Sequence, residues 1–162
     1  MIRTTFATLA SGLTLWAAAS VAQAQVPQYG PNVTHEQARK VLAAAIADAR
    51  RQNLPMAVAI VDTAGHLVAF ERMDNTQSAS IAVAQDKALS AAMYRRPTKV
   101  FQDLIAGGGV GLRVLSLRGA NAVEGGVPLA VDGKIIGAVG VSGGSSEQDG
   151  VVAKAGLDAL GK

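Results

Sequence analysis

The chain has 162 residues, with 15 Lys and Arg, 12 Asp and Glu, and no cysteine. The lack of cysteine excludes disulfides, thiolate metal sites and a cysteine nucleophile. The basic residues are scattered apart from the pairs at 50–51 and 95–96, so the small positive charge does not indicate a nucleic-acid partner.

Residues 1–24 are predicted to be an export signal that is not part of the fold. Arg3 gives a positive start, residues 9–21 are mostly apolar, and an A-x-A cleavage site ends at Ala24. The apolar run is short for a membrane span, although an uncleaved anchor is the alternative, and no later run reaches about 18 apolar residues. We therefore expect a mature protein that begins at Gln25, has no membrane span and is periplasmic or secreted.

The rest of the chain shows alternating helix and strand signals. Residues 25–33, with two prolines and a glycine, predict an irregular N-terminal arm, and residues 34–162 predict a single domain. Thr34 and Gln37 form a capping box at the start of the first helix. The expected elements are a helix at 34–53, strands at 56–62 and 66–72, helices at 81–94 and 97–105, strands at 127–131 and 134–141, and a helix at 145–160.

The most informative stretch is residues 124–144, in which two apolar runs are joined by Asp132-Gly133. Asp-Gly favours a type I′ hairpin turn, and strands joined by tight turns are antiparallel. We therefore predict an α+β fold with a central antiparallel sheet of about five strands, the fifth being a short strand within residues 110–123. The glycines of this hairpin indicate close approach to its backbone by a packed helix, a neighbouring subunit or a ligand.

A G-x-S-x-G pattern at residues 140–144 is typical of a hydrolase nucleophile elbow. The nucleophile in that motif needs a histidine later in the chain, and none follows position 66, which argues against a serine hydrolase. The backbone N–H groups where this strand leads into the last helix support another hypothesis, a haem-free module that binds a small carboxylate or phosphate ligand or a protein partner.

His35 and His66 are the only two histidines. His35 is expected at the first position of a helix, where the helix dipole favours a neutral imidazole with a free lone pair, but an exposed first-turn residue would look the same. His66 begins a strand directly after a turn. The two histidines do not have the spacing of a zinc site.

Several blocks together resemble the GlcG/HbpS-like family of haem-binding proteins, to which the C-terminal domain of PduO-type proteins also belongs. The blocks include E-R-M-D at 71–74, K-A at 87–88, G-G-V-P at 125–128 and G-A-V-G-V-S-G at 137–143. The resemblance implies helices on both sides of the sheet, a homo-oligomer (dimer or octamer) and bound haem. It also implies haem degradation or redox sensing in some members, so a haem-degrading or peroxidase-like enzyme is an alternative, and a membrane sensor protein is a conceivable partner.

The resemblance implies an axial haem-iron ligand that is histidine in some members and a hydroxyl residue in others. Haem also needs an apolar slot and cations for its propionates. The mature chain has few aromatic residues, which favours a site shared between subunits. The candidates are His35 and His66 as imidazole ligands, Ser78 and Ser80 as hydroxyl ligands, Arg72, Arg95 and Arg96 as propionate partners, and Met73 as slot lining.

Overall fold

The computed structural model describes residues 26–161, so the expected export signal lies outside the described residues. The fold is α+β, with four strands in one antiparallel sheet of order β2-β1-β4-β3. The strands are β1 (Ala57–Val61), β2 (Leu67–Arg72), β3 (Gly126–Val131) and β4 (Lys134–Ser142). The helices are α1 (His35–Arg51), α2 (Ser80–Tyr94), α3 (Lys99–Ala106) and α4 (Ser146–Leu160), with the 3₁₀ helix η1 (Gly109–Ser116) after α3.

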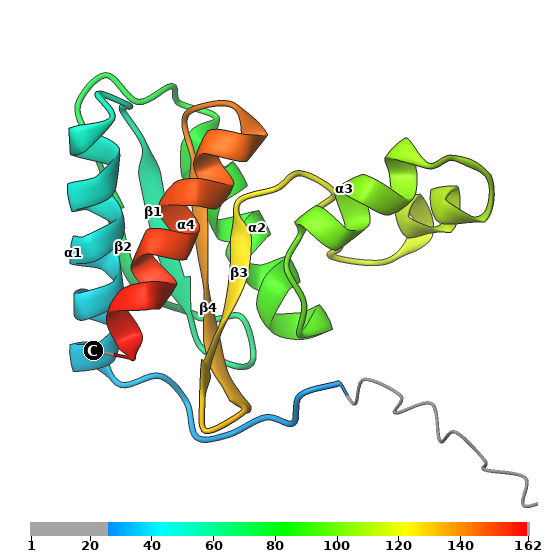
Figure 1. Ribbon diagram of the computed structural model, residues 1–162, viewed down its shortest axis with the longest axis horizontal. Helices are drawn as coiled ribbons and strands as arrows, with labels where there is room; N and C mark the ends of the chain where they lie inside the picture. Colours follow the sequence, from blue (N-terminus) through cyan, green and yellow to red (C-terminus); the bar gives the residue numbers. More distant parts are fainter. Residues whose placement is uncertain (1–25, 162) are drawn as a thin grey trace, which may run out of the picture.

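Helices cover both faces of the sheet, as predicted. Helices α1 and α4 lie side by side on one face, and α2 covers the other (Figure 1). Val58, Ile60 and Val139 face the first layer, whereas Ala57 and Ala59 face α2. The α2 interface is built almost entirely of alanines, which allows the helix to lie close to the strands.

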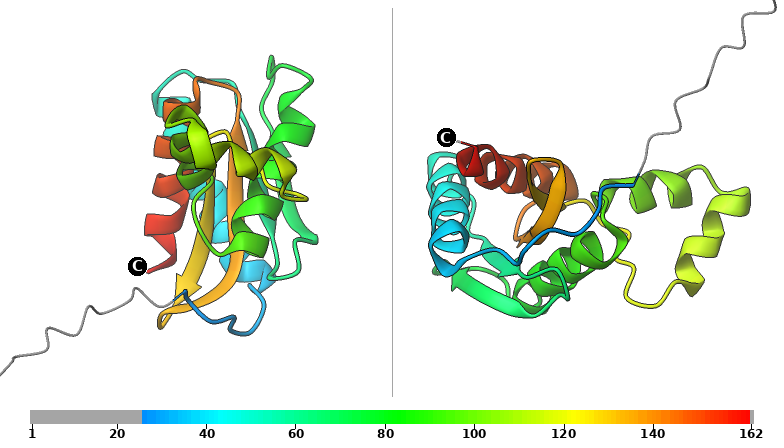
Figure 2. Two further views of the ribbon diagram at one scale, coloured as in Figure 1. Left: turned by 90° about the vertical axis from the view of Figure 1, so that its right-hand side faces the viewer. Right: turned by 90° about the horizontal axis from the view of Figure 1, so that it is seen from below.

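The prediction of about five strands was wrong by one. The fifth was expected within residues 110–123, where the chain forms η1 and a loop. Gly108 and Gly109 have φ angles of 64° and 53°, so they turn the chain after α3. Segment α3–η1 then projects away from the sheet, out of reach of a strand partner (Figures 1 and 2).

The local signals at the helix ends and the hairpin are confirmed. Thr34 and Ser145 each form a complete capping box, with Gln37 and Gln148 respectively. Asp132-Gly133 has φ angles of 50° and 73°, as a type I′ turn requires. Strand β4 lies inside the sheet between β1 and β3, while β3 forms an edge.

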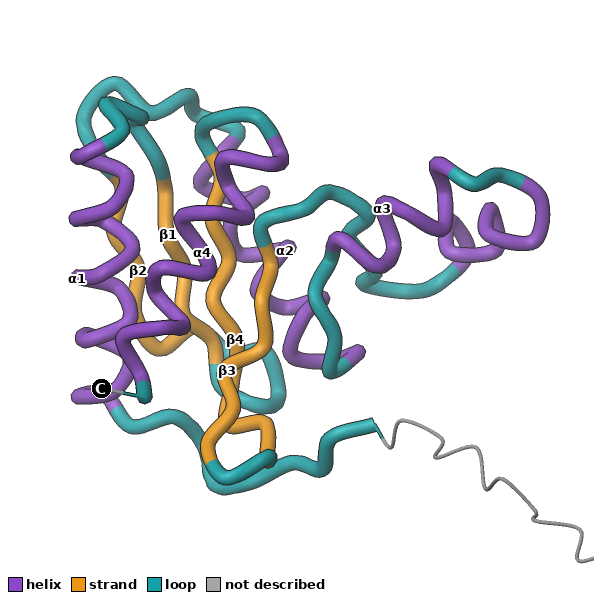
Figure 3. Tube along the Cα trace, viewed as in Figure 1, coloured by secondary structure: helices purple, strands orange, loops and turns teal. Residues whose placement is uncertain are grey.

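The sheet has two ends that position different groups. The turn end consists of the β1–β2 loop at residues 62–66 and the β3–β4 turn. The α4 end is where Arg72 and Ser142 both pair with Ala57 and where α4 begins. The N-terminal arm, residues 26–33, is an irregular segment that passes along the turn end (Figure 3). No helix within residues 26–161 is long and apolar enough to cross a membrane.

Candidate functional site

The predicted site residues do not converge on one place; they divide between the two ends of the sheet. The group at the turn end is His35, His66 and Arg95, with Arg96 next in the chain, and the group at the α4 end is Arg72, Met73, Ser78 and Ser80. Within one subunit, an imidazole ligand and a hydroxyl ligand from these two groups would therefore belong to different sites.

At the turn end, His66 is paired with a carboxylate. Its Nδ1 lies 3.3 Å from Oδ2 of Asp62, and the imidazole is 81% exposed, whereas the Asp62 side chain is 16% exposed. Oδ1 of Asp62 accepts hydrogen bonds from the backbone N–H groups of Ala64 and His66, each at 2.9 Å. Partial burial raises the pKa of Asp62, but these hydrogen bonds and His66 outweigh it and hold the pKa below 3.8.

His35 lies on the exposed first turn of α1, as expected from the sequence. No hydrogen bond to its imidazole is found among residues 26–161. The segment before it is tied to the His66 loop, because Thr63 donates to Oδ1 of Asn32 through its hydroxyl at 2.5 Å and its N–H at 3.3 Å. Both imidazoles thus belong to the same end of the molecule.

Arg95 is held by the N-terminal arm. Its Nη1 donates to the carbonyl of Pro27 at 3.1 Å, and its guanidinium lies over the Tyr29 ring at 5.0 Å. The Tyr29 hydroxyl lies 3.0 Å from the Ala92 carbonyl near the end of α2. Arg96 points elsewhere, over the Phe101 ring of α3 at 5.8 Å.

At the α4 end, the two serine candidates differ in access. Ser78 is exposed, whereas Ser80 is fully buried and its hydroxyl accepts a hydrogen bond from Ser142 at 3.1 Å. Arg72 and Met73 line a surface pocket of about 280 Å³. In this pocket Arg50 forms a 3.4 Å ion pair with Glu71, and neither serine belongs to its lining.

A buried ion pair lies near the same end, and it was not predicted from the sequence. Nζ of Lys87 on α2 lies 2.7 Å from Oδ2 of Asp149 on α4, and their side chains are 1% and 4% exposed. Lys87 also donates to the Val141 carbonyl at 3.1 Å. The sequence did carry a signal for a buried lysine, because Lys87 falls on the apolar face of α2 that Ala84, Ala88 and Ala91 define.

The N–H groups that precede α4 are occupied by the chain itself. Gly144 donates to Oδ1 of Asp149 at 3.0 Å, and Ser145 donates to Oε1 of Gln148 at 2.9 Å. Gln148 in turn donates to the Ser145 hydroxyl at 3.3 Å. Two of the donors on which the hypothesis of a carboxylate or phosphate ligand at this exit depended are therefore already used within the chain.

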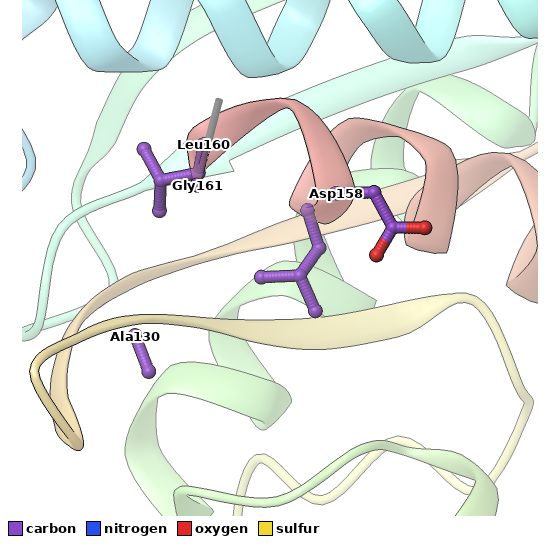
Figure 4. Close-up of a pocket in the computed structure, with 5 residues that line it drawn as sticks. Ala130, Asp158, Leu160 and Gly161 are labelled. Carbon is purple, nitrogen blue, oxygen red and sulfur yellow. The ribbon is translucent and has the colours of Figure 1, made fainter.

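A further surface pocket, of about 520 Å³, lies between the end of α4 and β3 (Figure 4). Leu157 and Leu160 give it an apolar side, and its one charged residue, Asp158, is paired with Lys154 at 2.7 Å. None of the predicted site residues lines this pocket. Within residues 26–161, no cluster of three or more metal-ligating side chains occurs.

The chain is similar to several known proteins. A model of the family "Haem degrading protein HbpS-like" matches residues 33–158. Protein GlcG of Escherichia coli strain K12 is 38% identical over 110 residues, which cover 68% of this chain and 81% of that protein. The crystal structure of HbpS has a TM-score of 0.75 at 27% identity, covering 83% of this chain and 94% of that one. The crystal structure of a PduOC:Heme complex has a TM-score of 0.71 at 29% identity, and the match covers 79% of this chain and 94% of that one.

Proposed function

The chain belongs to the HbpS-like family, and we propose that it binds haem. Two comparisons support this: the family model spans most of the described chain, and a protein of the same fold has been crystallised with haem. The observation on this chain that carries the proposal is the solvent-facing imidazole of His66 with a carboxylate behind it. Imidazoles oriented in this way are the usual nitrogen ligands of metals in proteins.

The residues present fit haem in their chemistry. The turn end offers the imidazoles of His35 and His66, and Arg95 and Lys134 are cations at the same end for propionates. Bound haem would supply an iron centre; one of the two imidazoles would ligate it, and the cations would orient it through its propionates. The pockets described above are shallow surface hollows that contain neither imidazole, so we propose that a second copy of the chain completes the apolar slot.

Titration of hemin into the purified protein, followed by the Soret band, tests the proposal directly. We expect saturable binding at a fixed ratio of haem to subunit, because a defined ligand and slot bind a limited number of molecules. Native mass spectrometry of the same sample reports subunit number and retained haem together. Weak, non-saturable binding would contradict the proposal.

We also propose that the protein is a homo-oligomer that associates through segment α3–η1. Val110, Leu112 and Leu115 in this segment are 76%, 47% and 73% exposed. The segment projects from the sheet and contacts little of its own chain (Figure 2). Exposed apolar groups gathered in this way are typical of surfaces that bind another protein.

The double variant Val110→Glu/Leu115→Glu should shift the protein from oligomer to monomer, because two carboxylates would have to be buried in the interface. Size-exclusion chromatography with light scattering measures the change. Val151→Glu is the matched control, since Val151 is 56% exposed on α4 and far along the chain from this segment. A monomeric wild type, or a double variant with unchanged mass, would contradict this interface.

We propose export, with residues 1–24 as the signal, and N-terminal sequencing of the protein from the periplasm should then begin at Gln25. Haem breakdown is a second candidate activity, because the family is described as haem-degrading. Incubation of the haem complex with a reductant and oxygen, compared with free hemin, tests it through the products formed.

A further inference from the structure

We propose that His66 supplies the axial ligand of the haem iron through Nε2, and that Asp62 is its positioning residue. This inference rests on the haem binding proposed above and selects one ligand from the four candidates. It assigns to Asp62 a role that sequence spacing alone did not indicate.

A hydrogen bond between the two side chains determines which imidazole nitrogen carries the proton. A carboxylate that is ionised can only accept, so the 3.3 Å contact between Oδ2 of Asp62 and Nδ1 of His66 places the proton of a neutral imidazole on Nδ1. The lone pair is then on Nε2. Because the imidazole is 81% exposed, Nε2 is available to a ligand outside the loop. A metal-ligating histidine has the same arrangement, with its second nitrogen donating to a carboxylate.

Several contacts hold the loop that carries the Asp62–His66 pair in place. The Asp62 N–H donates to the His66 carbonyl at 2.9 Å, so the two residues are joined through backbone and side chain. Gly65, at φ 86°, lies so close to Leu89 of α2 that a Cβ there would overlap the Leu89 side chain. Asn32 of the N-terminal arm anchors Thr63. An imidazole on such a support loses little further freedom on binding a metal.

The other three candidate ligands lack the combination of an exposed imidazole, a carboxylate partner and a supported loop. His35 is exposed without a side-chain partner among residues 26–161, Ser80 is buried against Ser142, and Ser78 is exposed at the opposite end of the sheet. Next to His66, Leu67 keeps an apolar side chain 50% exposed, which suits the face of a porphyrin.

The imidazole tautomer can be measured without haem. In ¹⁵N NMR spectra of the purified protein at a pH where histidine is neutral, His66 should be in the Nδ1–H form. In Asp62→Asn, the amide oxygen can still accept from the Ala64 and His66 N–H groups. Its NH₂ group can then face Nδ1 of His66 and donate to it. Nδ1 would have to be unprotonated to accept, so the variant should shift His66 to the Nε2–H form. A wild-type His66 in the Nε2–H form would overturn the inference whatever the outcome with haem.

Hemin titration then tests the ligand itself. His66→Ala should abolish the wild-type haem spectrum, and Asp62→Asn should weaken hemin binding about 10- to 100-fold. His35→Ala removes the competing imidazole and decides between the two candidate ligands. The control is Val151→Glu, an exposed position on α4 outside the candidate site, which should bind hemin as the wild type does. Circular dichroism confirms that each variant is folded, which is expected because the His66 side chain is largely exposed. Saturable binding by the wild type with an unchanged spectrum in His66→Ala would overturn this inference alone. Failure of the wild type to bind hemin saturably would overturn the proposed function and the inference with it.

Discussion

Replacing Lys87 with methionine should lower the free energy of unfolding by about 3–5 kcal/mol, the usual effect of removing one partner of a buried ion pair. The Asp149 carboxylate would remain 4% exposed without its ammonium partner, and the Val141 carbonyl would lose a donor. The pair also joins the helix layers on opposite faces of the sheet, since Lys87 belongs to α2 and Asp149 to α4. Urea denaturation of the wild type and Lys87→Met measures the difference.

The matched control is Lys154→Met. Lys154 pairs with Asp158 at the same distance of 2.7 Å, but these side chains are 67% and 52% exposed. An exposed pair contributes less than about 1 kcal/mol, so this variant should be close to the wild type in stability. Equal losses in the two variants would show that burial of the Lys87 pair has no special energetic role.

The loss in Lys87→Met should depend on pH. Burial raises the pKa of Asp149, while the Lys87 ammonium and the Gly144 N–H act in the opposite direction. Without Lys87 the pKa rises further above the value of 3.8 that the carboxyl has when unfolded. The folded state then binds the proton more tightly than the unfolded state, so the stability deficit of the variant should shrink as the pH falls from about 7 to about 4. A deficit that is constant over this range would contradict the assignment of the loss to the ionised carboxylate.

Much of the fold could be predicted because its signals are local. Each capping box needs two residues three apart, and the hairpin turn needs only Asp132-Gly133. The missing fifth strand shows the limit of such rules. The apolar residues of η1 fit a strand or a short helix equally well, and only the projection of this segment away from the sheet decides between them.

The candidate site was less predictable because its contacts join distant residues. Lys87 and Asp149 are 62 positions apart, and Arg95 meets Pro27 across 68 positions. The contact between Asp62 and His66 spans only four positions, yet it depends on the conformation of the loop between them. Two of the blocks that carried the family resemblance nevertheless meet at this ion pair. A Cβ on Gly125, in the G-G-V-P block, would lie within 3 Å of Lys87, in the K-A block, and of its partner Asp149.

Gly140→Ala should lower the free energy of unfolding by about 3 kcal/mol, at the upper end of the penalty for an overpacked core. A Cβ at this position of β4 would overlap the carbonyl oxygen of Ala84 and the backbone nitrogen of Ala88 on α2. These are backbone atoms, so no side-chain rotation can relieve the overlap, and α2 would have to move away from the sheet. The hairpin glycines were expected to allow close approach by a packed helix, a neighbouring subunit or a ligand. At Gly140 the group that approaches is the packed helix α2.

Gly107→Ala is the control that separates crowding from the change of residue type. Gly107 ends α3 at φ −72°, and a Cβ there would make an ordinary contact of 3.5 Å with the Asp103 carbonyl. This variant should be as stable as the wild type or gain about 0.4–1 kcal/mol, because alanine restricts the unfolded chain. Thermal unfolding of both variants gives the comparison. If Gly140→Ala is as stable as Gly107→Ala, then α2 can move without loss of stability. The alanine layer would in that case not fix the distance between α2 and β4.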